Sequence, residues 1–145
     1  MVTGIIHVAY NAKDMEASVN FYCDKLGFTR HVDINHKDGS PWIVYLRVPS
    51  AIPQYLELFY GQQERPASDL NPWTTVGYNH LCLSVDDIEE TCATLKSKGV
   101  VLDKEPNLGD DGNYQAWIHD PDGNRIELMQ MMPNSMQYSR EKNLP

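Results

Sequence analysis

The chain of 145 residues is poor in three features that mark common protein classes: positive charge, cysteine and long apolar runs. Its 12 Lys and Arg residues are outnumbered by 20 Asp and Glu residues, which leaves a formal net charge of −8. No basic cluster is long enough to follow a nucleic-acid backbone or an anionic bilayer. We therefore expect neither a nucleic-acid partner nor a membrane partner.

The scarcity of apolar runs and of cysteine also bears on the cellular compartment. Charged and polar residues interrupt the first twenty positions, so the apolar core of a signal peptide is missing. No later segment has the run of about 20 apolar residues that a membrane-spanning helix needs. Cys23, Cys82 and Cys92 form no CxxC pair and are odd in number, as expected of reduced thiols. These features predict a cytoplasmic protein without disulfides.

The composition that remains is that of an ordinary globular protein. Hydrophobic residues make up 41% of the chain, aromatic residues 10% and charged residues 22%. A chain of this length can bury about two thirds of its unfolded surface. We expect one domain that spans residues 1–145.

The first part of the chain predicts a strand, a helix and three strands. Residues 4–10, GIIHVAY, are rich in β-branched and aromatic residues and predict a strand. Asp14 can cap a helix that continues to Leu26 and ends at Gly27. Three strand-like runs follow, each set off by turn-forming residues: FTRHVDI, WIVYLRV and QYLELFY. The order predicts a βαβββ module over residues 4–61.

The second part restarts the same pattern. Residues 62–76 carry two prolines and no apolar periodicity, which indicates a surface connector. Then come the strand GYNHLCLSV and a helix capped by Asp86 and closed by Gly99. Short strands lead from there to YQAWIH, the turn DPDG and the strand NRIELMQM. This predicts a second βαβββ module over residues 77–131. Residues 132–145 are expected to be a frayed tail, although they could fold over a binding cleft or a partner chain.

Matching separations indicate that the two modules are copies of each other. From the histidine of the first strand to the glycine that ends the helix there are 20 residues in the first module and 19 in the second. From that glycine to the glutamate of the last strand there are 30 and 28. The equivalent residues are His7 and Glu57 in one module and His80 and Glu127 in the other.

His7, Glu57 and Glu127 have apolar neighbours on both sides, and His80 is followed by Leu81 and Cys82. A carboxylate in such a strand must face water or be paired, because burying it alone is very costly. In the simplest interpretation, Glu57 and Glu127 face solvent while His7 and His80 are core histidines. If the two copies pack about a pseudo-twofold axis, however, the four side chains would converge on one metal ion. Nitrogen and oxygen ligands without sulfur suit Ni, Co, Zn, Mn or Fe(II).

The sequence resembles the vicinal oxygen chelate superfamily, and within it the glyoxalase I branch. The resemblance covers residues 4 to about 130 and is carried by IIHVAY, ASVNFYCDKLGF, YLELFY, YNHLCLSV and HDPDGNRIELMQ, in that order. It implies an α+β fold of two βαβββ modules whose curled sheets enclose a metal cleft, within one chain or across a homodimer interface.

The number of ligands distinguishes the branches of that superfamily. Ring-cleaving dioxygenases and fosfomycin-type thiol transferases use three ligands, at positions that match His7, His80 and Glu127. Glu57 would be a fourth, which resembles glyoxalase I and the epimerases and favours Ni or Co. The resemblance implies a metal-dependent lyase or isomerase that acts through an enediolate on a 2-hydroxycarbonyl or thiol hemiacetal. Glu127 would be the base and Glu57 would act from the opposite face, unless both are plain ligands.

Strand alternation nominates the residues that line the substrate site. Asn11, Phe59, Gln115 and Trp117 share the face of a ligand and are candidate substrate contacts, with ordinary packing as the alternative. Other residues of the same parity are Ile5, Ala9, Tyr55, Arg125 and Met129.

Two positions differ from the glutathione-using glyoxalases. Asn11 and Gly61 stand where those enzymes place an arginine and an asparagine that hold the thiol peptide. The alternative is therefore a thiol-independent epimerase or isomerase of a keto sugar or hydroxy acid. A fosfomycin-type transferase, a ring-cleaving dioxygenase and a drug-binding module without catalysis are further alternatives.

Overall fold

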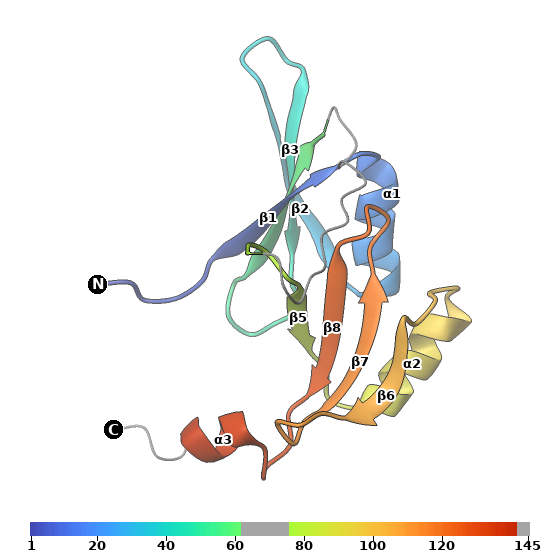
Figure 1. Ribbon diagram of the computed structural model, residues 1–145. Helices are drawn as coiled ribbons and strands as arrows, with labels where there is room; N and C mark the ends of the chain where they lie inside the picture. Colours follow the sequence, from blue (N-terminus) through green and yellow to red (C-terminus); the bar gives the residue numbers. More distant parts are fainter. Residues whose placement is uncertain (62–75, 142–145) are drawn as a thin grey trace. The chain divides into compact units, whose positions relative to one another are not determined.

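The computed structural model describes residues 1–61 and 76–141. The chain divides into two compact units, Met1–Asp69 and Leu70–Pro145. Each unit contains a four-stranded mixed sheet and a helix that connects its first strand to its second (Figure 1). The predicted α+β fold of two βαβββ modules is confirmed. The predicted connector, apart from Val76, lies outside the described residues.

The first unit contains a sheet in the order β1-β4-β3-β2. Its elements are β1 (His7–Ala12), α1 (Met15–Asn20), η1 (Phe21–Lys25), β2 (Thr29–Asn35), β3 (Pro41–Arg47) and β4 (Tyr55–Tyr60). Strand β1 pairs parallel to β4, and the other neighbours are antiparallel. The first and last strands of the module are therefore side by side, with Ala9 opposite Glu57.

The helix of the first unit begins and ends as the sequence predicts. The Asp14 carboxylate accepts a hydrogen bond from the Ala17 N–H at 3.0 Å, and Gly27 takes the left-handed conformation that a helix end requires, with φ 77°. The last turn, η1, is a wider π-helical turn, which an apolar pattern of 3.6 residues per turn cannot reveal. The core on this side of the sheet consists of Met15, Val19, Tyr22, Phe28, Val44, Leu46, Leu56 and Leu58.

The second unit repeats this topology, with the strand order β5-β8-β7-β6. Its elements are β5 (Leu81–Ser84), α2 (Ile88–Ser97), β6 (Lys104–Leu108), β7 (Tyr114–His119), β8 (Arg125–Gln130) and α3 (Met136–Glu141). Again the first and last strands, β5 and β8, are parallel neighbours. Helix α2 covers one face of the sheet (Figure 1), and the core comprises Ile88, Cys92, Leu95, Ala116, Ile118, Ile126 and Leu128.

Three boundaries differ from the sequence prediction. The first strand, predicted over residues 4–10, covers His7–Ala12. The cap of α2 is Asp87 rather than Asp86, since the Asp87 carboxylate accepts a hydrogen bond from the Glu90 N–H at 2.9 Å. Two adjacent aspartates precede the apolar run, and only the backbone conformation decides which of them is the cap. Strand β5 begins after His80, so His80 lies at the entrance of the strand instead of within it.

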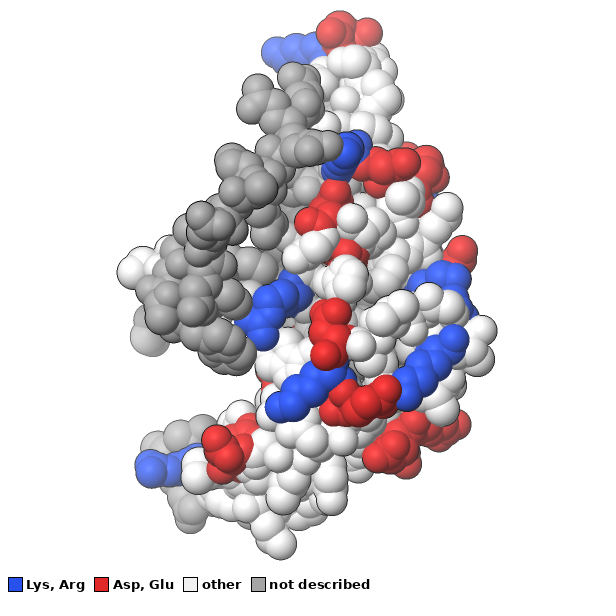
Figure 2. Space-filling model, turned by 45° about the vertical axis from the view of Figure 1, so that its right-hand side comes forward, with Lys and Arg blue, Asp and Glu red and all other residues white. Residues whose placement is uncertain are grey.

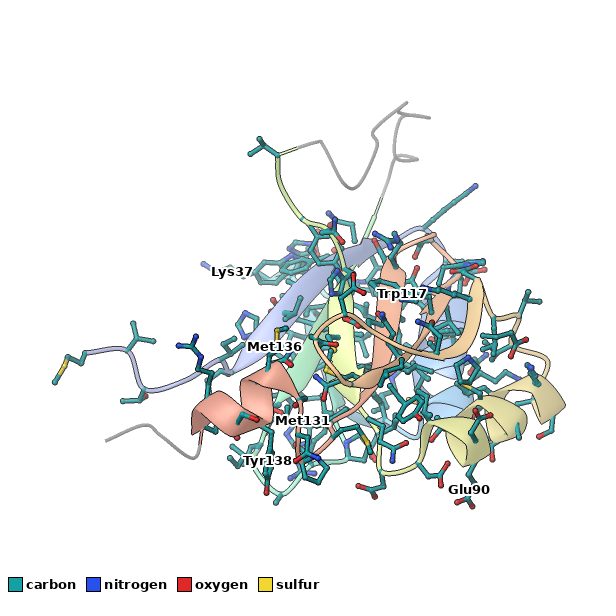
Figure 3. All side chains as sticks on the ribbon, turned by 60° about the horizontal axis from the view of Figure 1, so that its bottom comes forward. Lys37, Glu90, Trp117, Met131, Met136 and Tyr138 are labelled. Atoms are coloured by element: carbon teal, nitrogen blue, oxygen red, sulfur yellow. The ribbon has the colours of Figure 1, made fainter. Side chains whose placement is uncertain are left out.

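The C-terminal segment was expected to be frayed, but residues 136–141 form α3. The buried side chain of Asn113 holds this segment: it donates to Gln137 Oε1 at 2.6 Å and accepts from the Met132 N–H at 2.9 Å. The Met136 N–H also donates to the carbonyl of Asp111 at 2.8 Å. The turn between β6 and β7 therefore anchors α3, whose Met136 and Tyr138 are labelled in Figure 3.

The surface carries charge of both signs. On the described part of the face in Figure 2, Lys and Arg side chains alternate with Asp and Glu, and no continuous basic area forms. Within residues 1–61 and 76–141, no helix is long and apolar enough to cross a membrane.

The assignment of the α2 cap leads to a stability prediction. Asp87→Ala should lower the free energy of unfolding of the second unit by about 1 kcal/mol, because the N–H groups of the first helical turn lose an acceptor. Asp86→Ala is the matched control and should change stability much less. Urea unfolding followed by circular dichroism measures both, and equal losses in the two variants would contradict the assignment.

Candidate metal centre

In the first unit, the parallel pairing of β1 and β4 brings His7 to Glu57. His7 Nε2 lies 3.5 Å from Glu57 Oε2. The imidazole is 43% exposed while the carboxylate is only 9% exposed. The carboxylate is thus buried in the sheet, and the imidazole is the accessible partner.

Tyr45 is a third member of this half-site, and the sequence analysis missed it. It lies opposite Glu57 on β3, and its hydroxyl donates a short hydrogen bond to Glu57 Oε1. This bond, together with burial and the charge of Glu57, raises the pKa of Tyr45. The pairing of Tyr45 with Glu57 depends on the register of β3 against β4, and nothing in the sequence of either strand specifies that register.

The second unit repeats the histidine–glutamate pair between equivalent atoms. His80 Nε2 lies 3.0 Å from Glu127 Oε2, with the imidazole 30% and the carboxylate 9% exposed. Trp117, which projects from β7 (Figure 3), lies opposite Glu127 in the sheet. Its ring meets the His80 ring edge to face, with 4.9 Å between centroids. A bulky aromatic group therefore flanks this pair.

Cys82 lies next to Glu127 on the neighbouring strand β5. Burial, and then the charge and hydrogen bond of Glu127, raise the pKa of the Cys82 thiol to about 12. The thiol therefore stays protonated near neutral pH, which makes it a weak hydrogen-bond donor rather than a nucleophile.

The geometry of the two pairs fits a bound cation. In each pair, a nitrogen that can carry a lone pair faces a carboxylate oxygen, and two such electron donors repel unless a proton or metal ion lies between them. The simplest interpretation of the sequence, with solvent-facing glutamates and core histidines, does not hold, because both glutamates are buried and both histidines are partly exposed. Imidazole nitrogen and carboxylate oxygen are ligands that divalent transition metals accept.

Each pair supplies only part of a ligand set. Among residues 1–61 and 76–141, no three His, Cys, Asp or Glu side chains are grouped so that they could hold a metal ion. His7 and Glu57 belong to the first unit, and His80 and Glu127 belong to the second.

The candidate substrate residues lie on the same sheet faces as these pairs. In the first unit, Asn11 pairs with Phe59, two positions along the strands from the pairing of Ala9 with Glu57. In the second unit, Gln115 lies two positions from Trp117 on β7 and accepts a hydrogen bond from the indole N–H at 3.2 Å. The sheet faces assigned to these residues from strand alternation therefore agree with the strand registers in the structure.

Comparison with known proteins identifies the family. Residues 4–128 match the family described as Glyoxalase/Bleomycin resistance protein/Dioxygenase superfamily. The chain belongs to this superfamily. Its glyoxalase fold is also found in solved structures, including a glyoxalase family protein from Enterococcus faecalis, with 30% identity, a TM-score of 0.69, and coverage of 88% of this chain and 97% of the other.

Relatives within the superfamily carry names of two kinds. A protein of Synechocystis sp. named "Probable lactoylglutathione lyase" is 28% identical over 135 residues, which cover 87% of this chain and 94% of that protein. The crystal structure of TnmS3 from Streptomyces sp. CB03234, an antibiotic binding protein, is 26% identical with a TM-score of 0.69, covering 90% and 98% of the two chains. Both a lyase and a ligand-binding protein are thus among the chain's relatives.

The hydrogen bond from Tyr45 to the buried Glu57 leads to a second prediction. In protein stripped of metal by a chelator, Tyr45→Phe should lower the free energy of unfolding of the first unit by about 1–3 kcal/mol, because a buried acceptor loses its donor. The matched control is Tyr55→Phe, which removes a hydroxyl from the neighbouring ring but leaves Glu57 bonded. Chemical denaturation gives both values. If the two variants were equally stable, the bond would contribute nothing.

Proposed function

We propose that the protein is a metal-dependent lyase or isomerase of the glyoxalase I type. Its substrate would be a small 2-hydroxycarbonyl compound or a thiol hemiacetal. The observation that carries the proposal is the repeated approach of a histidine Nε2 to a buried glutamate Oε2, at 3.5 Å in one unit and 3.0 Å in the other. The relatives named lactoylglutathione lyase support the same chemistry.

In this proposal one divalent ion is held by His7, Glu57, His80 and Glu127. Ni²⁺ or Co²⁺ is favoured, and Zn²⁺, Mn²⁺ or Fe²⁺ would also accept these ligands. Such an ion, when bound, would polarise a carbonyl oxygen and make the neighbouring C–H more acidic. The four ligands could come from one chain or from two chains of a homodimer. The homodimer and the cytoplasmic location are parts of the proposal.

The proton transfer itself falls to a carboxylate of the protein. The Glu57 carboxylate accepts a hydrogen bond from the hydroxyl of Tyr45, whereas the Glu127 carboxylate lies beside the weakly donating thiol of Cys82. Glu127 would therefore leave its surroundings at a lower cost, and we assign it as the base that removes the proton from carbon. Glu57 would act as a ligand and, after taking a proton from solvent, would deliver it from the opposite face, while Glu127 would give its proton to solvent.

A second candidate is a thiol-independent epimerase or isomerase of a keto sugar or hydroxy acid. It is favoured by the surroundings of Gly61, whose N–H donates to the carbonyl of Ala12 at 2.8 Å. A Cβ atom at position 61 would lie 3.0 Å from that carbonyl oxygen, so a side chain there would require the backbone at Ala12 to shift by a few tenths of an ångström. Asn11, beside it on β1, offers an amide in place of a cation.

The metal site can be tested by elemental analysis of purified protein. We expect one divalent ion per wild-type chain and a loss of most of it in His7→Ala and His80→Ala, because each removes a ligand. His36→Ala and His119→Ala are matched controls from the same two units and should retain the metal. A metal-free wild-type protein that binds aromatic drugs would instead indicate a ligand-binding protein. Loss in the histidine variants but not in Glu57→Gln or Glu127→Gln would exclude the glutamates as ligands.

The reaction type can be tested by proton exchange in deuterated water. With thiol hemiacetals of methylglyoxal, keto sugars and 2-hydroxy ketones as the panel, deuterium should enter the carbon beside the carbonyl. In Glu127→Gln the rate should fall by about two to four orders of magnitude, as is typical for the loss of a general base. Mass spectrometry of the recovered substrate measures the label.

The panel also separates the two candidate functions. Exchange with glutathione adducts alone would support the lyase, and exchange with thiol-free substrates would support the isomerase. Oxygen consumption with a catechol, or thiol addition to fosfomycin, would overturn the proposed reaction type.

A further inference from the structure

We propose that Asn79 and Arg125 are positioning residues that hold His80 in one tautomer, with the proton on Nδ1 and the lone pair on Nε2. Three contacts within the second unit carry this inference. Asn79 Oδ1 lies 2.7 Å from His80 Nδ1, Arg125 Nη1 lies 3.1 Å from the same Oδ1, and His80 Nε2 lies 3.0 Å from Glu127 Oε2.

The guanidinium of Arg125 determines which end of the Asn79 amide faces it. Arginine can only donate hydrogen bonds, so the amide atom 3.1 Å from Nη1 must be the oxygen rather than the NH₂ group. That oxygen can only accept, so the His80 nitrogen 2.7 Å from it must carry the hydrogen. A neutral imidazole with a proton on Nδ1 has its lone pair on Nε2.

The consequence concerns the nitrogen that faces Glu127. With Nδ1 protonated, Nε2 is the nitrogen that faces Glu127, and it can offer its lone pair to a metal ion that displaces any proton shared with the carboxylate. A hydrogen bond to the other ring nitrogen of a metal-binding histidine fixes both its tautomer and its orientation, and losing that bond typically weakens metal binding about 10–100-fold. Here a side-chain amide provides the bond, and a guanidinium orients the amide.

Arg125 also holds the aromatic group beside His80. Its guanidinium carbon lies 4.5 Å from the centroid of the Trp117 ring, and that ring meets the imidazole edge to face. The Arg125 guanidinium therefore contacts both the Asn79 amide and the Trp117 indole, the two groups that flank the His80 imidazole. A lysine at this position would lack the planar group that can stack and donate at the same time.

The first unit provides an internal comparison. The residue before His7 is Ile6, which offers no side-chain acceptor, and the residue paired with His7 on β4 is Tyr55 rather than an arginine. The proposed arrangement therefore distinguishes the second copy from the first. His7 can serve as a reference signal that changes in Asn79 and Arg125 should leave unaltered.

The tautomer can be measured directly in the metal-free protein. Long-range ¹H–¹⁵N correlation spectra of ¹⁵N-histidine-labelled protein should show a proton on His80 Nδ1, with or without a second proton that Nε2 shares with Glu127. In Asn79→Leu the proton should move in part or wholly to Nε2, and in Arg125→Met the two forms should mix, because the amide is no longer oriented. Asn79→Asp keeps the accepting oxygen and should restore the wild-type spectrum.

Metal affinity provides the second measurement. Titration with Ni²⁺ or Co²⁺ should give a dissociation constant about 10–100-fold higher for Asn79→Leu than for wild type, whereas Asn79→Asp should stay near wild type. A wild-type His80 protonated on Nε2 alone, or an unchanged tautomer and affinity in Asn79→Leu, would overturn the proposal. The affinity argument rests on the proposed metal site but the spectrum does not. A wild-type protein with the expected tautomer that binds no metal would therefore refute the proposed function and leave the positioning role standing.

Discussion

A buried carboxylate facing an imidazole nitrogen is the interaction on which the candidate site depends. The side chains of Glu57 and Glu127 are each 9% exposed and lie between buried apolar residues of their strands, and such burial is costly unless a partner compensates it. The parallel pairing of the first and last strand of each module supplies the partner, because it places His7 and His80 beside the glutamates. In each pair the imidazole is the accessible partner, while the carboxylate is buried.

The two modules share this arrangement but surround it differently. Glu57 is tied by the phenol of Tyr45, while Glu127 lies beside the protonated thiol of Cys82. His80 has an amide at Nδ1, and the residue before His7 is an isoleucine. The two similar pairs thus have different neighbours: the Glu57 carboxylate accepts a hydrogen bond from a phenol, and the His80 imidazole faces a side-chain amide.

Membership of the glyoxalase superfamily establishes the fold but leaves the chemistry open, because relatives with the same fold are named as lyases and as antibiotic-binding proteins. The distinction lies in individual side chains. Gly61 packs against the backbone at Ala12, where a Cβ atom would lie 3.0 Å from the carbonyl oxygen. In the proposed site, a metal ion held by the two pairs would accept many small oxygen-bearing substrates, so the residues around the pairs would decide which substrate binds.

The sequence by itself determined the two modules, the four candidate ligands and the sheet faces they share. Strand alternation, helix caps and the spacing of the repeat depend on local chemistry that each segment carries within itself. Only the tertiary structure decided which side chains meet across strands. Tyr45 reaches Glu57, and Arg125 reaches Asn79 across 46 positions of the chain, because strand register and backbone placement bring them together. Such contacts depend on the packing of the whole module, and no local pattern encodes them.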